Sequence, residues 1–104
     1  MPKFVFAYHG GGAPSDPAEQ EKVMAAWSAW YGSMGAHVVD GGGPAGKSTT
    51  VSHAGIVEDG GANPLSGLTI VEAADKAAAV DMARGCPMVV DGSGSVEVAE
   101  ILQM

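Results

Sequence analysis

Apolar positions recur along the chain with two different periods, and these predict strands in some segments and helices in others. Residues 3–9 (KFVFAYH) alternate the aromatic side chains of Phe4, Phe6 and Tyr8 with smaller apolar ones. Successive side chains of a strand point to opposite faces. The segment is therefore predicted to be a strand with both faces at least partly buried.

A single amphipathic helix is predicted for residues 16–34. Ser15 or Asp16 can cap its N-terminus, and apolar side chains that include Trp27 and Trp30 follow at helical spacing. The glycine after this segment favours the end of the helix, because glycine readily adopts the backbone conformation of a C-terminal cap.

The remaining segments are predicted to form four further strands and a second, short helix. The strands are assigned to residues 36–40, 47–57, 68–73 and 95–104, and the helix to residues 75–85. The order β-α-β-β-β-α-β indicates an α+β fold, a ferredoxin-like sandwich with one added hairpin strand. All 104 residues are expected to form a single domain.

Such a sandwich has helices on one face of its sheet and leaves the other face uncovered. In this chain the uncovered face carries too many apolar and aromatic residues for contact with water. Two copies that pack these faces together would bury them, so a homodimer is expected.

Residues 41–48 (GGGPAGKS) match the phosphate-binding P-loop pattern. A functional P-loop needs a helix directly after it, because the helix N-terminus binds the phosphate. The segment that follows, STTVSHAGIV, is rich in β-branched residues, which favour a strand. Residues 41–47 are therefore predicted to form a wide hairpin turn and not a nucleotide site.

The acidic composition argues against several classes of partner. Twelve Asp and Glu stand against five Lys and Arg, a formal net charge of −7, so neither nucleic acid nor an anionic membrane surface is expected to bind. No apolar run has the length of a membrane span, and the N-terminus lacks a signal-peptide pattern. The single Cys86 is predicted to be a packed residue in a reducing, cytoplasmic environment.

Four segments carry a resemblance to a known family: AAWSAWYGSMGAHVVDGGGPAGK, VEDGGA, LTIVEAADKAAAVDMARGCPMV and GSGSVEVAEI. In these segments the chain resembles the YCII-related family, and within it the branch named for a DGPF motif. The resemblance implies a dimeric α+β barrel, in which two sheets face each other around small clefts. It also implies small-molecule chemistry by a His–Asp pair in some members, while others accompany transcription factors of the sigma class.

The chain departs from the pattern of that branch at two places. The branch commonly has a histidine ahead of the first tryptophan of its helix, where this chain has Val23 or Met24. Where the branch has the sequence DGPF, this chain has DGGA at residues 59–62, so the phenylalanine of the motif is missing. Only Asp59 and Gly60 can be carried over from that motif.

Three histidines, His9, His37 and His53, are the candidates for proton transfer, because histidine changes its charge near neutral pH. His9 ends the first strand beside a glycine run, which permits close approach of a ligand. His9 or His53 could face a cleft and be oriented by Asp40 or Asp59. The alternative is that each histidine lies at a strand end or on the surface, and that both acids are ordinary turn residues before glycine.

Trp27, Tyr8 and Gly60 are the candidates for contacts with a ligand. Trp27 has the size to wall an aromatic pocket, although its helical spacing also fits a place in the core. Glu97, on the last predicted strand, is expected to face solvent or the rim of a dimer. No Cys and His pair has zinc spacing, and neither a metal nor another cofactor is expected.

Two classes of function are compatible with these residues. One is a cofactor-independent enzyme of the YCII-related type that moves a proton on a small organic molecule, with His9 or His53 beside Asp59 or Asp40. The other is a non-catalytic binding or regulatory interaction module, which the missing histidine and phenylalanine favour. A monooxygenase of the same general architecture is a third alternative. A histidine with an acidic neighbour in a closed pocket would favour the enzyme.

Overall fold

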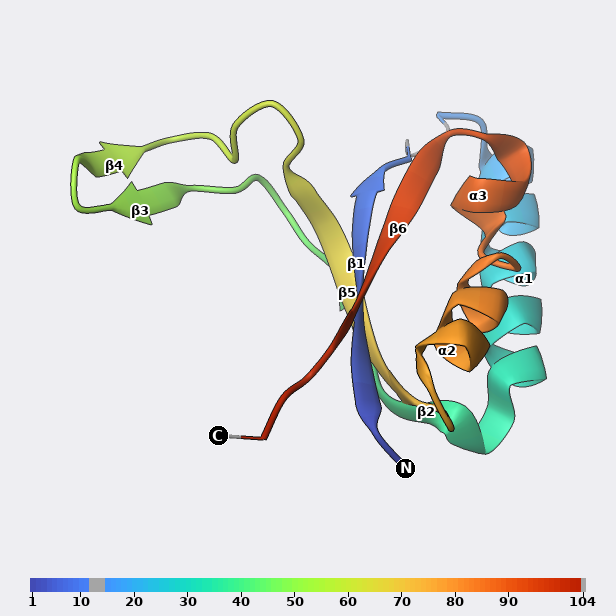
Figure 1. Cartoon of the computed structure of the whole chain (residues 1–104). Helices are drawn as coiled ribbons and strands as arrows, with labels where there is room; N and C mark the ends of the chain where they lie inside the picture. Colours follow the sequence, from blue (N-terminus) through green and yellow to red (C-terminus); the bar gives the residue numbers. More distant parts are fainter. Residues whose placement is uncertain (12–14, 104) are drawn as a thin grey trace.

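The computed structural model describes residues 1–11 and 15–103. Its elements are, in chain order, β1 (Lys3–Gly10), α1 (Pro17–Met34), the 3-10 helix η1 (Gly35–His37), β2 (Val38–Pro44), β3 (Thr50–Ser52), β4 (Gly55–Val57), β5 (Leu65–Glu72), α2 (Lys76–Ala83), α3 (Pro87–Asp91) and β6 (Gly94–Glu100) (Figure 1). Gly12 of the predicted glycine run and Met104 of the predicted last strand lie outside the described residues.

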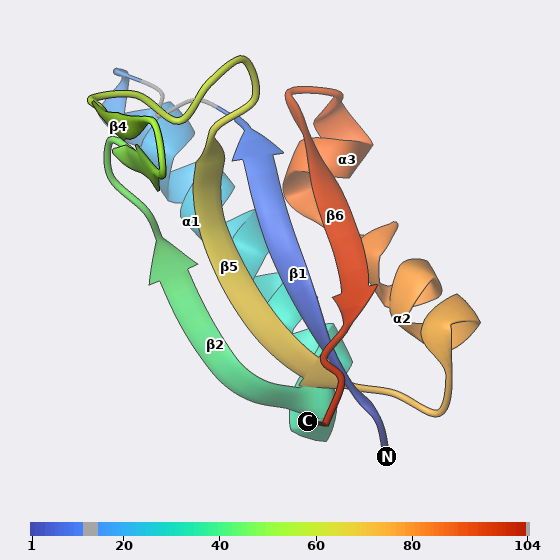
Figure 2. The same cartoon turned by 60° about the vertical axis from the view of Figure 1, so that its left-hand side comes forward.

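Four strands form one antiparallel sheet in the order β2-β5-β1-β6. The helices α1, α2 and α3 all lie on one face of this sheet, which we call the covered face (Figures 1 and 2). The opposite face, which we call the open face, has no helix over it in either view. Strand β5 lies between β1 and β2, the split arrangement of a ferredoxin-like sandwich. The predicted fold class is thereby confirmed.

The predicted third strand, residues 47–57, does not join this sheet. It contains two short strands, β3 and β4, which pair with each other as a separate two-stranded sheet. The β-branched residues predicted extended backbone correctly, but a turn at residues 53–54 divides the segment, where Ser52 Oγ accepts a hydrogen bond from the Ala54 backbone N–H. Together with its two flanking loops this hairpin forms an arm, residues 45–64, that projects from the sheet (Figure 1).

The structure differs from the predictions at two further places. Residues 41–44 continue β2 beside β5 and do not turn, so only the segment after Pro44 leaves the sheet. A helix that was not predicted, α3, follows α2, and Pro87 occupies its first position, where proline fits without loss of a hydrogen bond. Cys86 precedes α3 and is fully buried, as predicted, and burial raises the pKa of its thiol.

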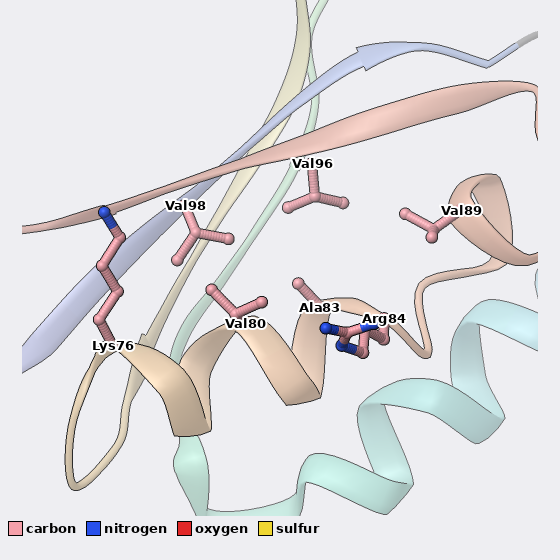
Figure 3. A pocket seen from close by; sticks show the side chains of 7 residues that line it. All are labelled: Lys76, Val80, Ala83, Arg84, Val89, Val96 and Val98. Carbon is pink, nitrogen blue, oxygen red and sulfur yellow. The ribbon is translucent and has the colours of Figure 1, made fainter.

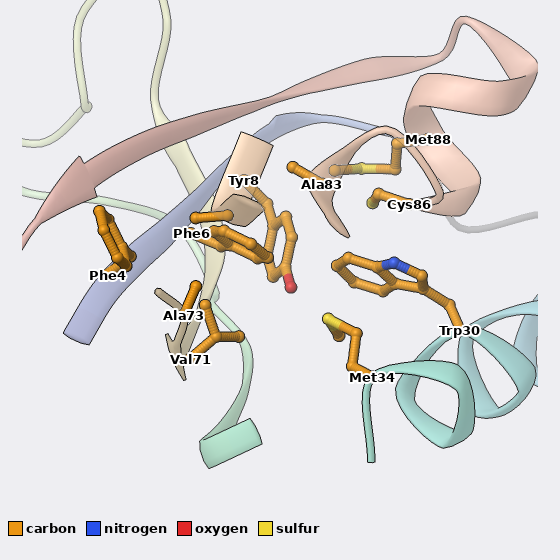
Figure 4. Close-up of a cluster of buried hydrophobic side chains, with 11 residues drawn as sticks. Phe4, Phe6, Tyr8, Trp30, Met34, Val71, Ala73, Ala83, Cys86 and Met88 are labelled. Carbon is orange, nitrogen blue, oxygen red and sulfur yellow. The ribbon is translucent and has the colours of Figure 1, made fainter. Parts of the chain in front are cut away.

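The core lies between the covered face and the helices (Figure 4). Phe4 and Phe6 of β1 are almost completely buried there, and the indole ring of Trp30 stacks on Phe6 with 6.1 Å between ring centroids. Trp30 also donates a hydrogen bond from Nε1 to the Met82 carbonyl at 2.9 Å, which ties α1 to α2. The ring contact and the hydrogen bond together explain why α1 has a tryptophan at this core-facing position.

A hollow of about 330 Å³ lies between α2, α3 and β6, with Val80 and Val96 on opposite sides, Lys76 at one end and Val89 at the other (Figure 3). In the part of the chain that the structure describes, no helix combines the length and the apolar character that crossing a bilayer requires.

Candidate functional site

A pocket of about 400 Å³ lies where the arm leaves the sheet, and we call it the arm-base pocket. Its lining comes from three segments, which are residues 10–11 at the end of β1, residues 45–48 at the start of the arm, and residues of the 59–66 segment at its end. The glycine- and lysine-containing turn and the DGGA segment, which are separated in sequence, therefore meet at one site.

Gly60 allows the two ends of the arm to approach each other at this pocket. A Cβ atom at Gly60 would lie 2.6 Å from the Cβ of Pro64 and 2.8 Å from the Cβ of Ser48, both closer than real contacts allow. Beside it, the Asp59 carboxylate accepts a hydrogen bond from the Gly61 backbone N–H at 2.9 Å. Asp59 thus acts as a turn residue that also lines the pocket.

His9 is adjacent to the arm-base pocket and is held from both sides of its ring. Its Nδ1 lies 3.1 Å from the Asn63 carbonyl oxygen and 3.2 Å from that of Pro64, and its Nε2 lies 2.9 Å from Oε1 of Glu97. Carbonyls and ionised carboxylates only accept hydrogen bonds. The contacts at Nδ1 and at Nε2 can therefore both be hydrogen bonds when each of the two ring nitrogens carries a hydrogen. The His9 side chain is only 13% exposed, whereas that of Glu97 is 71% exposed.

The pairing of β1 with β6 explains how Glu97 reaches His9. Glu97 lies opposite Ala7 and Ser95 lies opposite His9, so His9 and Glu97 are diagonal neighbours on the open face. Glu97 was expected at the solvent or at a dimer rim and was not among the predicted site residues. The sequence shows that Glu97 alternates with apolar residues along its strand. It does not show the register between β1 and β6 that places Glu97 beside His9.

The other predicted acid and histidine lie elsewhere. Asp40 is on the edge strand β2, two strands away from β1, and its carboxylate accepts a hydrogen bond from the Gly42 backbone N–H at 2.9 Å. His53 is exposed in the turn between β3 and β4 at the tip of the arm. In this structure His9 is therefore oriented by Glu97, and not by Asp40 or Asp59.

Tyr8 and Trp27 lie on the covered side of the sheet, away from His9. The Tyr8 hydroxyl donates a hydrogen bond to Thr69 Oγ1 at 2.7 Å, and its ring meets that of Trp27 edge to face with 5.2 Å between centroids. Burial raises the pKa of Tyr8 well above its usual range, although the hydrogen bond to Thr69 opposes this shift. Tyr8 is thus a neutral, hydrogen-bonded core residue near neutral pH, and Trp27 packs against the same core.

His37 and the hollow beside β6 offer less chemistry. His37 Nδ1 contacts the Glu72 carbonyl oxygen at 2.9 Å, outside the arm-base pocket. The hollow is lined by five apolar side chains together with Lys76 and Arg84, so its lining has neither a histidine nor a carboxylate. Among the residues placed by the structure, no three His, Cys, Asp or Glu side chains gather as a metal ion would require.

This arrangement defines an α+β protein with a small-molecule-sized pocket at one end of an antiparallel sheet. The chain is similar to a solved structure, 5-chloro-2-hydroxyhydroquinone dehydrochlorinase (TftG) from Burkholderia phenoliruptrix in complex with 2,5-dihydroxybenzoquinone. The TM-score is 0.60 at 16% sequence identity, and the match covers 100% of this chain and 96% of that chain. This likeness shows a shared α+β fold. Neither a protein-family model nor a curated protein matches the chain.

Proposed function

We propose that the protein binds a small organic anion in the arm-base pocket and that His9 moves a proton to or from it. The observation that carries this proposal is the contact of both His9 ring nitrogens with acceptors beside a pocket that also holds Lys47. Lys47 and a doubly protonated His9 are cationic hydrogen-bond donors, which suit a carboxylate or a phenolate. The small volume of the pocket restricts the ligand to a small molecule.

The two ring nitrogens of His9 have different roles in this proposal. Main-chain carbonyls of Asn63 and Pro64 hold the Nδ1 hydrogen and thereby fix the orientation of the ring. Glu97, at Nε2, is mostly exposed, so an oxygen of the substrate can displace its carboxylate there. Nε2 then donates its proton to the substrate, and Glu97 returns to orient the ring once Nε2 has taken up a proton again, from the substrate in a later step or from solvent.

The solved structure with a similar fold indicates which class of substrate to consider. That protein is named as a dehydrochlorinase of a hydroxyhydroquinone and was solved with 2,5-dihydroxybenzoquinone. We therefore propose small hydroxylated aromatic compounds and small carboxylates as the first ligands to test on this chain.

We further propose that the protein belongs to the YCII-related family and to its DGPF branch, that it forms a cytoplasmic homodimer, and that it carries out small-molecule chemistry without a cofactor. Asp59 and Gly60 of the DGGA segment line the same pocket as Lys47, which supports a shared function for those motif residues. The apolar open face supports the homodimer. The free thiol of Cys86 fits a reducing compartment.

A second candidate is the non-catalytic binding module, and one observation favours it. The carbonyls that His9 Nδ1 contacts belong to Asn63 and Pro64, the last two residues of the arm, as they would if this side chain only fastened the end of the arm to the sheet. In that case the arm-base pocket binds its ligand without proton transfer.

The test is two-dimensional NMR of the histidine rings during titration with 2,5-dihydroxybenzoquinone and with a panel of small carboxylates and phenols. We expect the His9 ring signals to move with one class of probe while those of His37, which lies outside the pocket, stay in place. The matched variants are His9→Gln, which should lose the response, and His37→Gln, which should keep it. No movement of His9 with any probe would contradict the enzyme and leave the module as the better account.

A further inference from the structure

The arm carries an apolar pair that no other residue placed by the structure covers. Val51 and Ile56 face each other across β3 and β4, and their side chains are 74% and 67% exposed. A two-stranded hairpin is marginally stable at best in water when no further layer packs on it. An apolar pair on such a hairpin indicates a surface that is covered in the working protein.

The arm projects on the same side of the molecule as the open face (Figures 1 and 2). Its projection makes the radius of gyration 14.8 Å, whereas a compact domain of this length has about 13 Å. The open face carries apolar residues on three neighbouring strands: Val39 of β2 and Leu68 of β5 are 44% and 36% exposed, and Val5 of β1 pairs with Ile70 of β5. The arm and the open face thus carry exposed apolar residues on the same side of the molecule.

We infer that the arm packs against the open face of a second copy of this chain, in a reciprocal exchange of arms between two protomers. This inference rests on the homodimer of the proposed function. A second copy is the occupant that the geometry favours, because a two-fold axis lets one contact, used twice, cover both apolar surfaces of each protomer.

Charge favours the same occupant. The chain has a formal net charge of −7, yet residues 49–57 contain no Asp, Glu, Lys or Arg. A contact segment without carboxylates avoids the repulsion that two equally acidic copies would otherwise meet. A basic partner would instead be matched by acidic side chains on the arm strands.

The arm exchange would place His53 on the partner protomer, and it would make one wall of the arm-base pocket depend on the dimer. His53 lies at the tip of the arm, away from His9 of its own chain, and the exchange carries it onto the partner protomer. The base of the same arm supplies Lys47, Asp59 and Gly60 to the pocket. A second copy that fixes the position of the arm therefore also fixes one wall of the arm-base pocket.

The test is analytical ultracentrifugation of the full chain over a dilution series. The arm variant is Val51→Thr with Ile56→Thr, since threonine keeps the β-branched shape that suits a strand and adds a hydroxyl. The matched control is Val90→Thr with Met24→Gln, whose side chains are 74% and 70% exposed on the helix side of the molecule. Circular dichroism checks that each variant keeps its fold.

We expect a dimer for the unchanged chain and for the control, and a dimer dissociation constant at least about tenfold larger for the arm variant. A folded arm variant that dimerises as tightly as the control would overturn the arm exchange and leave the proposed homodimer standing. An unchanged chain that stays monomeric at all concentrations would overturn both. As a second readout, the His53 ring signals should shift on dilution of the unchanged chain, and signals that stay constant through dissociation count against the exchange.

Discussion

Gly60 is a residue whose lack of a side chain shapes the arm-base pocket. We expect Gly60→Ala to force Ser48 and Pro64 apart, because the added methyl group would overlap both. Binding of the NMR probes should weaken by about tenfold or more, which corresponds to about 1.4 kcal/mol. Gly43→Ala is the control, since a Cβ atom there meets nothing within 4 Å. Equal affinity in both variants would show that the two arm ends need not approach so closely for binding.

Tyr8 gives a prediction about pH. Its folded-state pKa lies above the unfolded value of about 10, so its contribution to stability is fully present below pH 10 and decreases as the pH rises further. We expect the free energy of unfolding to fall less steeply above pH 10 in Tyr8→Phe than in the unchanged chain, as measured by urea denaturation. The substitution should also cost about 1 kcal/mol at neutral pH through the hydrogen bond to Thr69. Parallel curves for the two proteins above pH 10 would contradict burial of the hydroxyl.

At the scale of the elements, Trp30 is the contact through which α1 holds both the sheet and α2. Trp30→Phe should keep most of the stacking on Phe6 but remove the hydrogen bond to the Met82 carbonyl. We expect a loss of about 1 to 3 kcal/mol in the free energy of unfolding, measured by denaturant titration. Trp27→Phe is the matched control in the same helix, because Trp27 is only partly buried. A larger loss at Trp27 would place the main helix–sheet contact one turn earlier.

The sequence predicted elements better than the way they meet. Periodicity identified β1, α1 and β5, because each carries a regular apolar face that follows from its own geometry. It did not divide residues 47–57, since a turn at His53 has no glycine or proline inside it and the flanking residues favour strands. The pairing of His9 with Glu97 depends on the register between the first and last strands of the sheet, and no local pattern encodes that register.

At the scale of the whole molecule, the arm exchange makes the site and the assembly interdependent. The arm-base pocket has one wall on the sheet and one on the arm, and the exchange would fix the arm through the second copy. A ligand that bridges the two walls then stabilises the arm position that the dimer needs. By reciprocity, the factor by which saturating ligand tightens the dimer equals the product of the factors by which dimerisation tightens ligand binding at its two sites.

This coupling is measurable with any probe that moves the His9 signals. We expect the dimer dissociation constant to fall severalfold when the probe is saturating, and the affinity of the probe at each site to fall by about the square root of that factor when the chain is diluted into its monomeric range. The arm variant Val51→Thr with Ile56→Thr should bind the probe with the weak, monomer-like affinity at concentrations where the unchanged chain is dimeric. If the affinity is the same for monomer and dimer, each protomer builds its pocket alone, and the arm serves assembly without serving the site.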